Sequence, residues 1–79
     1  MRCAISSRAG QVIAQGRLII DKDENGELRL NFQTDGGRVI QGGAIASDGD
    51  LTAASQELFR QFRSAWRMID CTLTAKSDG

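Results

Sequence analysis

Hydrophobic and polar residues alternate along four stretches in the first half of the chain. A period of two is typical of β-strands that bury one face. The second stretch is the least regular and has apolar side chains on both faces, whereas the third alternates cleanly, with Leu28, Leu30 and Phe32 on one side. The four predicted strands are residues 2–7, 11–21, 27–34 and 38–41.

The pattern changes in the second half, where apolar positions recur every three or four residues. At about 100° per residue these positions lie on one stripe of a helix, and Phe59 and Trp66 widen the stripe to an arc of about 140°. Asp50, just before the stripe, favours a helix start. The stripe consists of Leu51, Ala54, Leu58, Phe62, Ala65 and Ile69. We therefore predict an amphipathic helix over residues 50–68 and a last strand over residues 69–75.

The predicted order is four strands, one helix and one strand. A sheet and a helix that each have an apolar face bury those faces against one another. The sequence therefore predicts an α+β domain: an antiparallel sheet of four to five strands, connected as a meander, with one amphipathic α-helix packed on one face. We place a single domain at residues 1–75 and expect residues 76–79 to form a disordered tail.

The segment DKDENGE, which begins at Asp21, has the D-x-D-x-N-G spacing of the first half of a calcium-binding EF-hand loop. The ninth position of such a loop falls here on Arg29 and the twelfth on a phenylalanine, and neither ligates calcium. A three-residue loop ending at Gly26, in the left-handed conformation, would set Ile20 opposite Leu30 and keep the apolar faces together. We therefore predict a hairpin turn and no metal site.

Ten Lys and Arg residues balance ten Asp and Glu residues, so the whole molecule has no net charge. Local charged patches remain free to bind partners. The longest apolar runs are far shorter than the ~20 residues that cross a bilayer, and no signal peptide is recognisable, so we expect a soluble, cytoplasmic protein without membrane contact. Cys3 and Cys71 are expected to be reduced thiols, because small secreted domains usually carry more cysteines.

Residues that carry common chemistries are missing. The chain contains no histidine and no tyrosine, so a cysteine nucleophile would lack its imidazole partner. Two cysteines cannot supply the three or four ligands that zinc uses. The glycine pairs at residues 36–37 and 42–43 lack the lysine of a phosphate-binding loop and indicate only a turn and a bend or bulge. We therefore predict a non-enzymatic protein without a cofactor.

One cluster on the predicted helix stands out. Three arginines spaced i, i+3 and i+7 project within about 60° of one another, and no acidic residue lies between Leu58 and Met68. They border the two aromatic residues that widen the apolar stripe, and arginine and tryptophan are enriched at binding hot spots. A solvated arginine face beside core aromatic residues is the alternative. The predicted partner-binding site is Arg60, Arg63, Arg67, Trp66 and Phe59.

These observations favour a small protein-binding module that occupies an acidic surface of a larger protein or complex. Accessory or inhibitory proteins of phages and mobile elements often take this form, which is an analogy of size and class. A nucleic-acid-binding accessory factor ranks lower, because Phe32 points inward and three arginines neutralise few phosphates. A homodimeric structural protein is the third reading, since Ile13 and Ile19 on the outer side of the second strand would contact another chain.

Overall fold

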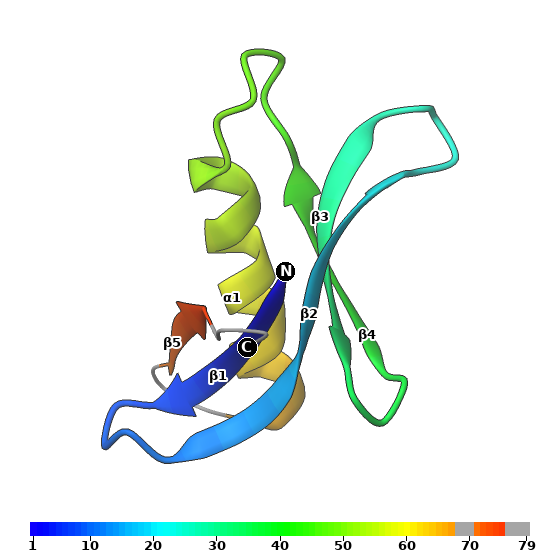
Figure 1. Cartoon of the computed structure of the whole chain (residues 1–79). Coiled ribbons are helices and arrows are strands. Elements are labelled where there is room, and N and C mark those ends of the chain that lie inside the picture. Colours follow the sequence, from blue (N-terminus) through cyan, green and yellow to red (C-terminus); the bar gives the residue numbers. More distant parts are fainter. Residues whose placement is uncertain (68–70, 76–79) are drawn as a thin grey trace.

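The structure is a computed structural model that describes residues 1–67 and 71–75, with side chains up to position 73 (Figure 1). It confirms the α+β class and the order β-β-β-β-α-β. The predicted start of the last strand at residue 69 and the predicted tail lie outside the described residues. The helix ends at Trp66, two residues before the predicted end at residue 68, because Arg67 is left-handed. The elements are β1 (Arg2–Ser7), β2 (Val12–Lys22), β3 (Leu28–Thr34), β4 (Val39–Ala44), α1 (Thr52–Trp66) and β5 (Cys71–Ala75).

The strands form one curled antiparallel sheet in the order β4-β3-β2-β1-β5. The first four strands follow one another as a meander, as predicted, and β5 joins the sheet at the opposite edge from β4. Figure 1 shows α1 running along the inner side of this curl. Ala54, Leu58 and Phe62 are the buried positions of the helix, which confirms the core of the predicted stripe.

The turn between β2 and β3 is the predicted three-residue loop. The Asp23 N–H donates to the carbonyl of Glu27 (2.8 Å), and Gly26 has a φ of +80°. Ile20 lies opposite Leu30, so the apolar faces of the two strands coincide. The same turn, ending in a glycine with positive φ, closes three further loops at Gly10, Gly37 and Gly49.

The core lies between α1 and the inner face of the sheet. Phe32 and Phe62 meet edge to face, with their ring centroids 6.3 Å apart. A bulge formed by Gly42 and Gly43 brings β4 against the helix: a Cβ at Gly43 would lie 3.0 Å from the Cβ of Glu57. The glycine pair therefore sets the helix-to-sheet spacing. The buried core residues are Cys3, Ile5, Leu30, Phe32, Ile40, Ala54, Leu58 and Phe62.

A second bulge changes the predicted faces of β2 at the start of the strand. The ladder with β1 passes from the pair of Ile5 and Ala14 to the pair of Ser6 and Val12, which leaves Ile13 as an extra residue. Ile13 packs against the core and Val12 is exposed, the reverse of the alternation in the sequence. The prediction that Ile13 shares an outer face with Ile19 is therefore wrong, so Ile13 is not part of the surface expected to hold a homodimer.

Cys3 and Cys71 form no disulfide bond. Cys3 belongs to β1 and Cys71 to the neighbouring strand β5, but Cys3 pairs with position 75 and Cys71 pairs with Ser7. They therefore occupy different rungs of the same ladder. Burial raises the pKa of the Cys3 thiol and keeps it protonated.

Candidate functional site

α1 begins at the end of an acidic loop. The Asp50 carboxylate accepts hydrogen bonds from the backbone N–H of Thr52 (2.9 Å) and from its hydroxyl (2.7 Å), and these bonds hold the pKa of Asp50 below its ordinary value. The negative charge of this carboxylate also interacts favourably with the positive end of the helix dipole. The helix ends at Trp66, and Arg67 follows in the left-handed conformation with a φ of +54°. Arg67 is therefore turned off the helix rather than continuing its face.

Arg60, the first predicted arginine, is not free. Its Nε donates to Oε2 of Glu57 (2.9 Å), and a second bond joins Nη2 to Oε1. Gln61 donates to the same carboxylate (2.9 Å). These contacts lower the pKa of Glu57 to about 2 and raise that of Arg60. We expected no acidic residue to neutralise the three arginines, and this expectation is wrong at Arg60. The neutralising residue is Glu57, which lies just before the stretch from Leu58 to Met68 that contains no acid.

The charges of Arg63 and Arg67 are not neutralised by an ion pair with any described residue. Arg63 is half-buried and Arg67 is exposed, and no carboxylate in residues 1–67 or 71–73 forms an ion pair with either. Arg63 lies one helical turn before Trp66, and Arg67 directly follows Trp66 in the chain. The cationic part of the predicted site is thus concentrated at the C-terminal end of α1.

Trp66 occupies the middle of a stack that runs from the surface to the core. Its ring lies parallel to that of buried Phe62, with centroids 4.1 Å apart. On the opposite side the guanidinium carbon of Arg38 lies 4.4 Å from the Trp66 ring centroid. Phe59 is half-buried and is not among the described apolar side chains that pack against the core. Arg38, Arg63, Trp66 and Arg67 together are called the basic–aromatic face below.

The sequence did not predict Arg38 as a residue of the site. It follows a glycine turn between β3 and β4, where an arginine is unremarkable, and it meets Trp66 only because the sheet curls toward the helix. No local spacing signals such a contact.

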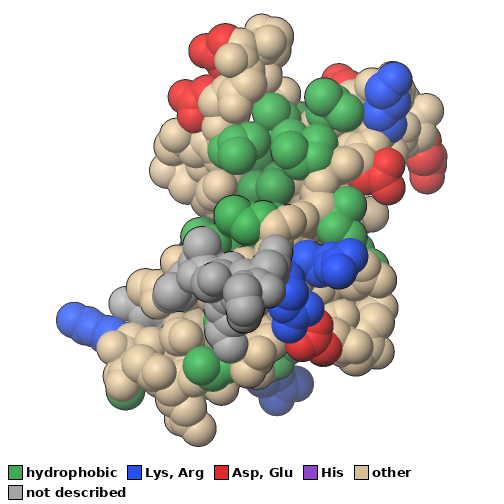
Figure 2. All heavy atoms as spheres, viewed as in Figure 1, with side chains coloured by type: hydrophobic (Ala, Val, Ile, Leu, Met, Phe, Trp, Pro, Cys, Tyr) green, Lys and Arg blue, Asp and Glu red, His purple; other side chains and the backbone are tan. Residues whose placement is uncertain are grey.

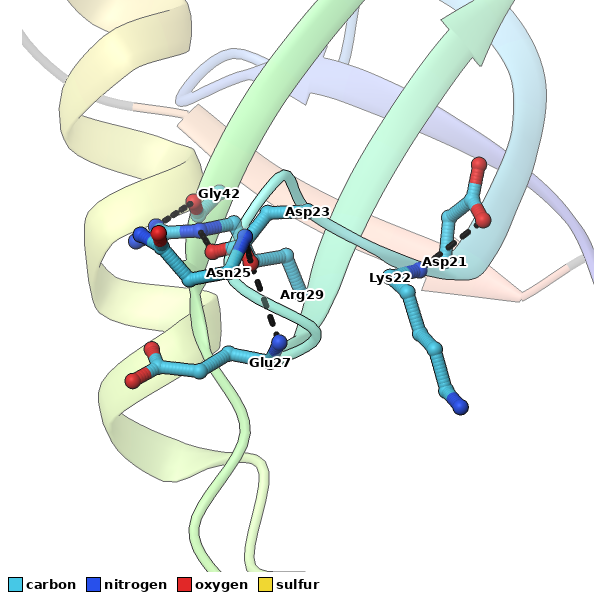
Figure 3. A network of polar contacts seen from close by, with 7 residues as sticks. All are labelled: Asp21, Lys22, Asp23, Asn25, Glu27, Arg29 and Gly42. Carbon is cyan, nitrogen blue, oxygen red and sulfur yellow. Dashed lines mark hydrogen bonds and ion pairs between the residues drawn. The ribbon is translucent and has the colours of Figure 1, made fainter.

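The segment that resembles a calcium loop uses its central carboxylate to close the turn (Figure 3). One oxygen of Asp23 accepts the N–H groups of Asn25 (2.8 Å) and Glu27 (3.0 Å), and the other accepts Nε of Arg29 (2.7 Å). The bond from Arg29 is the main cause of the lowered pKa of Asp23. The flanks are strands, as predicted. Within the described residues no group of three or more His, Cys, Asp or Glu side chains is arranged to hold a metal ion.

Charge is unevenly distributed although the whole chain is neutral. Residues 21–29 carry four carboxylates against two cations, and residues 46–51 carry Asp48 and Asp50 without a cation, so each segment has a net charge of −2. These two segments are called the acidic tips. The remaining described side chains comprise seven arginines and two carboxylates, a net charge of +5.

An apolar surface lies between the acidic tips. Figure 2 shows hydrophobic side chains gathered there, with acidic side chains on either side. By their pairing the residues share the inner face of the sheet. This apolar inner patch consists of Met1, Leu18, Ile20, Leu28 and Ile45. The alternation along β2 and β3 predicts that their members of the patch lie on the inner face, but it does not predict that the helix leaves them uncovered.

Comparisons with protein-family models, with curated proteins and with solved structures found no match to this chain. In the part of the chain that is described, no helix combines the length and the apolar character needed to span a membrane.

Proposed function

We propose that the protein is a non-enzymatic binding module that docks its basic–aromatic face on an acidic surface of a larger protein or complex. The observation that carries the proposal is the stack of Arg38, Trp66 and Phe62. The stack fixes the indole before any partner arrives, so docking loses little side-chain entropy. Arg63 and Arg67 add positive charge beside this anchor, and Arg60 lies at its margin with a charge already balanced by Glu57.

The groove between α1 and β4 offers little for catalysis. This groove has a volume of about 420 Å³ and its lining includes Arg29, Gln41, Glu57 and Gln61. Glu57 is the one carboxylate of the lining, and a pKa of about 2 makes it a poor proton donor or acceptor near neutral pH. The lining contains no cysteine, serine or lysine that would serve as a nucleophile.

The test is quantitative capture of partners from the native host with the wild-type chain and two charge-reversed variants. The face variant is Arg63→Glu with Arg67→Glu, and the matched control is Arg8→Glu with Arg17→Glu, two exposed arginines elsewhere. We expect a protein partner retained by the wild type and the control but weakened at least about ten-fold in the face variant. Equal capture by all three proteins would contradict the proposal.

Trp66 provides a second readout, since the chain has one tryptophan and no tyrosine. Binding of a purified partner at the basic–aromatic face should change the intrinsic fluorescence. Should the double variant fail to fold, Arg67→Glu alone tests the same point, because Arg67 is exposed and lies outside the helix. A partner that binds without changing the emission would place its site elsewhere.

The net charge of +5 outside the acidic tips also favours a second candidate, a nucleic-acid-binding accessory factor that uses the same face. Phosphate binding by arginines is strongly salt-dependent, because it releases counterions. A steep loss of oligonucleotide affinity with salt, abolished in the face variant, would support this candidate. Absence of binding at low salt would remove it.

A further inference from the structure

The apolar inner patch is exposed because the β2–β3 hairpin extends beyond the region that α1 covers. The helix packs against β4 and β3 at the glycine bulge, whereas Ile20 and Leu28 lie near the hairpin end of the sheet. Ile20 is 56% exposed, Leu28 46% and Met1 64%. Leu51, at the start of α1, is 39% exposed. Scattered apolar residues on a surface are ordinary, but a contiguous group marks a contact site.

The acidic tips on either side determine what kind of partner fits. The carboxylates of Glu24 and Glu27 receive no hydrogen bond from any side chain in the described part of the chain. On the other side, Asp48 accepts only the backbone N–H of Asp50 among the described groups (3.0 Å). A partner that covers the patch therefore comes close to carboxylates with unused acceptor capacity at both borders.

We propose that the apolar inner patch binds a cationic amphipathic segment of a partner protein. Leucine-like side chains on one side of that segment would cover Ile20 and Leu28, and lysine or arginine side chains at its borders would pair with the acidic tips. The apolar contact supplies most of the affinity, and the charges supply orientation and the rate of association.

Charge also argues against other occupants. A second copy docked through the same patch about a two-fold axis would bring two pairs of acidic tips together. Phosphate backbones and anionic membranes would be repelled by the same carboxylates. The site differs in position and in charge from the basic–aromatic face, so the protein would present two docking surfaces of opposite sign.

The probe is a fluorescein-labelled peptide of about 14 residues in which leucines recur every three or four positions and lysines fill the rest. One control peptide replaces each lysine by glutamate, and another replaces each leucine by serine. Fluorescence anisotropy of the peptides is measured against the full chain at physiological salt. We expect binding of the lysine–leucine peptide, no binding of the glutamate peptide, and at least about ten-fold weaker binding of the serine peptide.

Matched variants locate the site. Ile20→Lys and Leu28→Lys introduce a cation into the patch, and Val39→Lys makes the same change at an equally exposed residue on β4 outside it. We expect the first two variants to weaken peptide binding at least about ten-fold and Val39→Lys to leave it unchanged. Thermal melts followed by circular dichroism confirm that each variant is folded.

Three results would overturn the proposal: no binding by the wild type, equal loss in all three variants, or a wild-type dimer in sedimentation that Ile20→Lys dissociates. Equal loss in all three variants would indicate general charge attraction, and a dimer that Ile20→Lys dissociates would mean that a second copy of the chain covers the patch. The Arg63→Glu, Arg67→Glu variant should bind the peptide as the wild type does. Failure of the basic–aromatic face and failure of this patch are therefore separate outcomes.

Discussion

At the scale of single residues, two missing side chains decide how closely helix and sheet approach. A Cβ at Gly43 would lie 3.1 Å from the Cα of Ala54, and one at Gly42 would lie 3.0 Å from the Cβ of Leu58 and closer still to the carbonyl of Leu30. These neighbours are backbone or buried atoms and have little room to move. Gly42 and Gly43 are therefore needed because they lack a side chain, whereas the turn glycines are needed because they adopt a positive φ.

Gly43→Ala should therefore destabilise the fold. We expect a loss of about 1–3 kcal/mol in the free energy of unfolding, because the added methyl group forces α1 away from β4. Urea unfolding followed by circular dichroism measures it. Gly36→Ala is the matched control, since its Cβ would meet only Oγ1 of Thr34, at 3.8 Å, and its φ is not positive. An equal loss in both variants would show that close packing at Gly43 is not the cause.

At the scale of elements, the sequence predicted best where an element is constrained by its own pattern. The apolar faces of β2 and β3 had to coincide, and that requirement alone selected the three-residue turn at Gly26. The stripe of α1 identified its buried positions for the same reason. Its end at Trp66 was missed, because the left-handed Arg67 has no signal such as glycine at that position.

Contacts between elements could not be predicted from the sequence. Ile13 looked outward by alternation, and only the pairing of β1 with β2 reveals the bulge that turns it to the core. Arg38 and Trp66 meet through the curl of the sheet. The apolar inner patch was hidden in the same way, because Ile20 and Leu28 alternate as core residues do, and whether the helix reaches them depends on where the glycine bulge docks it.

The β2–β3 turn should depend on Asp23 and not on calcium. Asp23→Ala removes the carboxylate that accepts hydrogen bonds from two backbone N–H groups and from Arg29, and we expect the free energy of unfolding to fall. Glu24→Ala, an exposed neighbour in the same turn, should be close to neutral. The melting temperature of the wild type should not change when calcium is added. A rise with calcium would mean that the segment binds the ion after all.

At the scale of the whole molecule, neutrality conceals a separation of charge between the acidic tips and the rest of the surface. Several carboxylates are held ionised by specific donors: Asp23 by Arg29, Asp50 by Thr52 and Glu57 by Arg60. Each has a pKa below its ordinary value in the folded state. The unfolded chain therefore binds more protons in acid, and stability must fall as the pH drops.

The expected pH window follows from these values. Stability from Glu57 is fully present above its ordinary pKa of 4.5 and is lost as the pH falls toward about 2. Thermal melts between these limits should show a falling melting temperature, and Glu57→Gln should make the decline shallower. Glu24→Gln, which removes a carboxylate with no side-chain donor among the described residues, should keep the wild-type slope. Identical slopes in both variants would contradict a role for the Arg60 contact.

The pairing of β5 with β1 has a consequence for how the chain is made. β1 is synthesised before the other strands of the sheet, yet the strand that completes its free side, residues 71–75, is synthesised after them. Until then β1 presents a row of unsatisfied backbone groups, a template on which a neighbouring nascent chain can add a strand. Translation that stalls before residue 71 should therefore yield fragments prone to aggregate or to be captured by chaperones, whatever the stability of the finished domain.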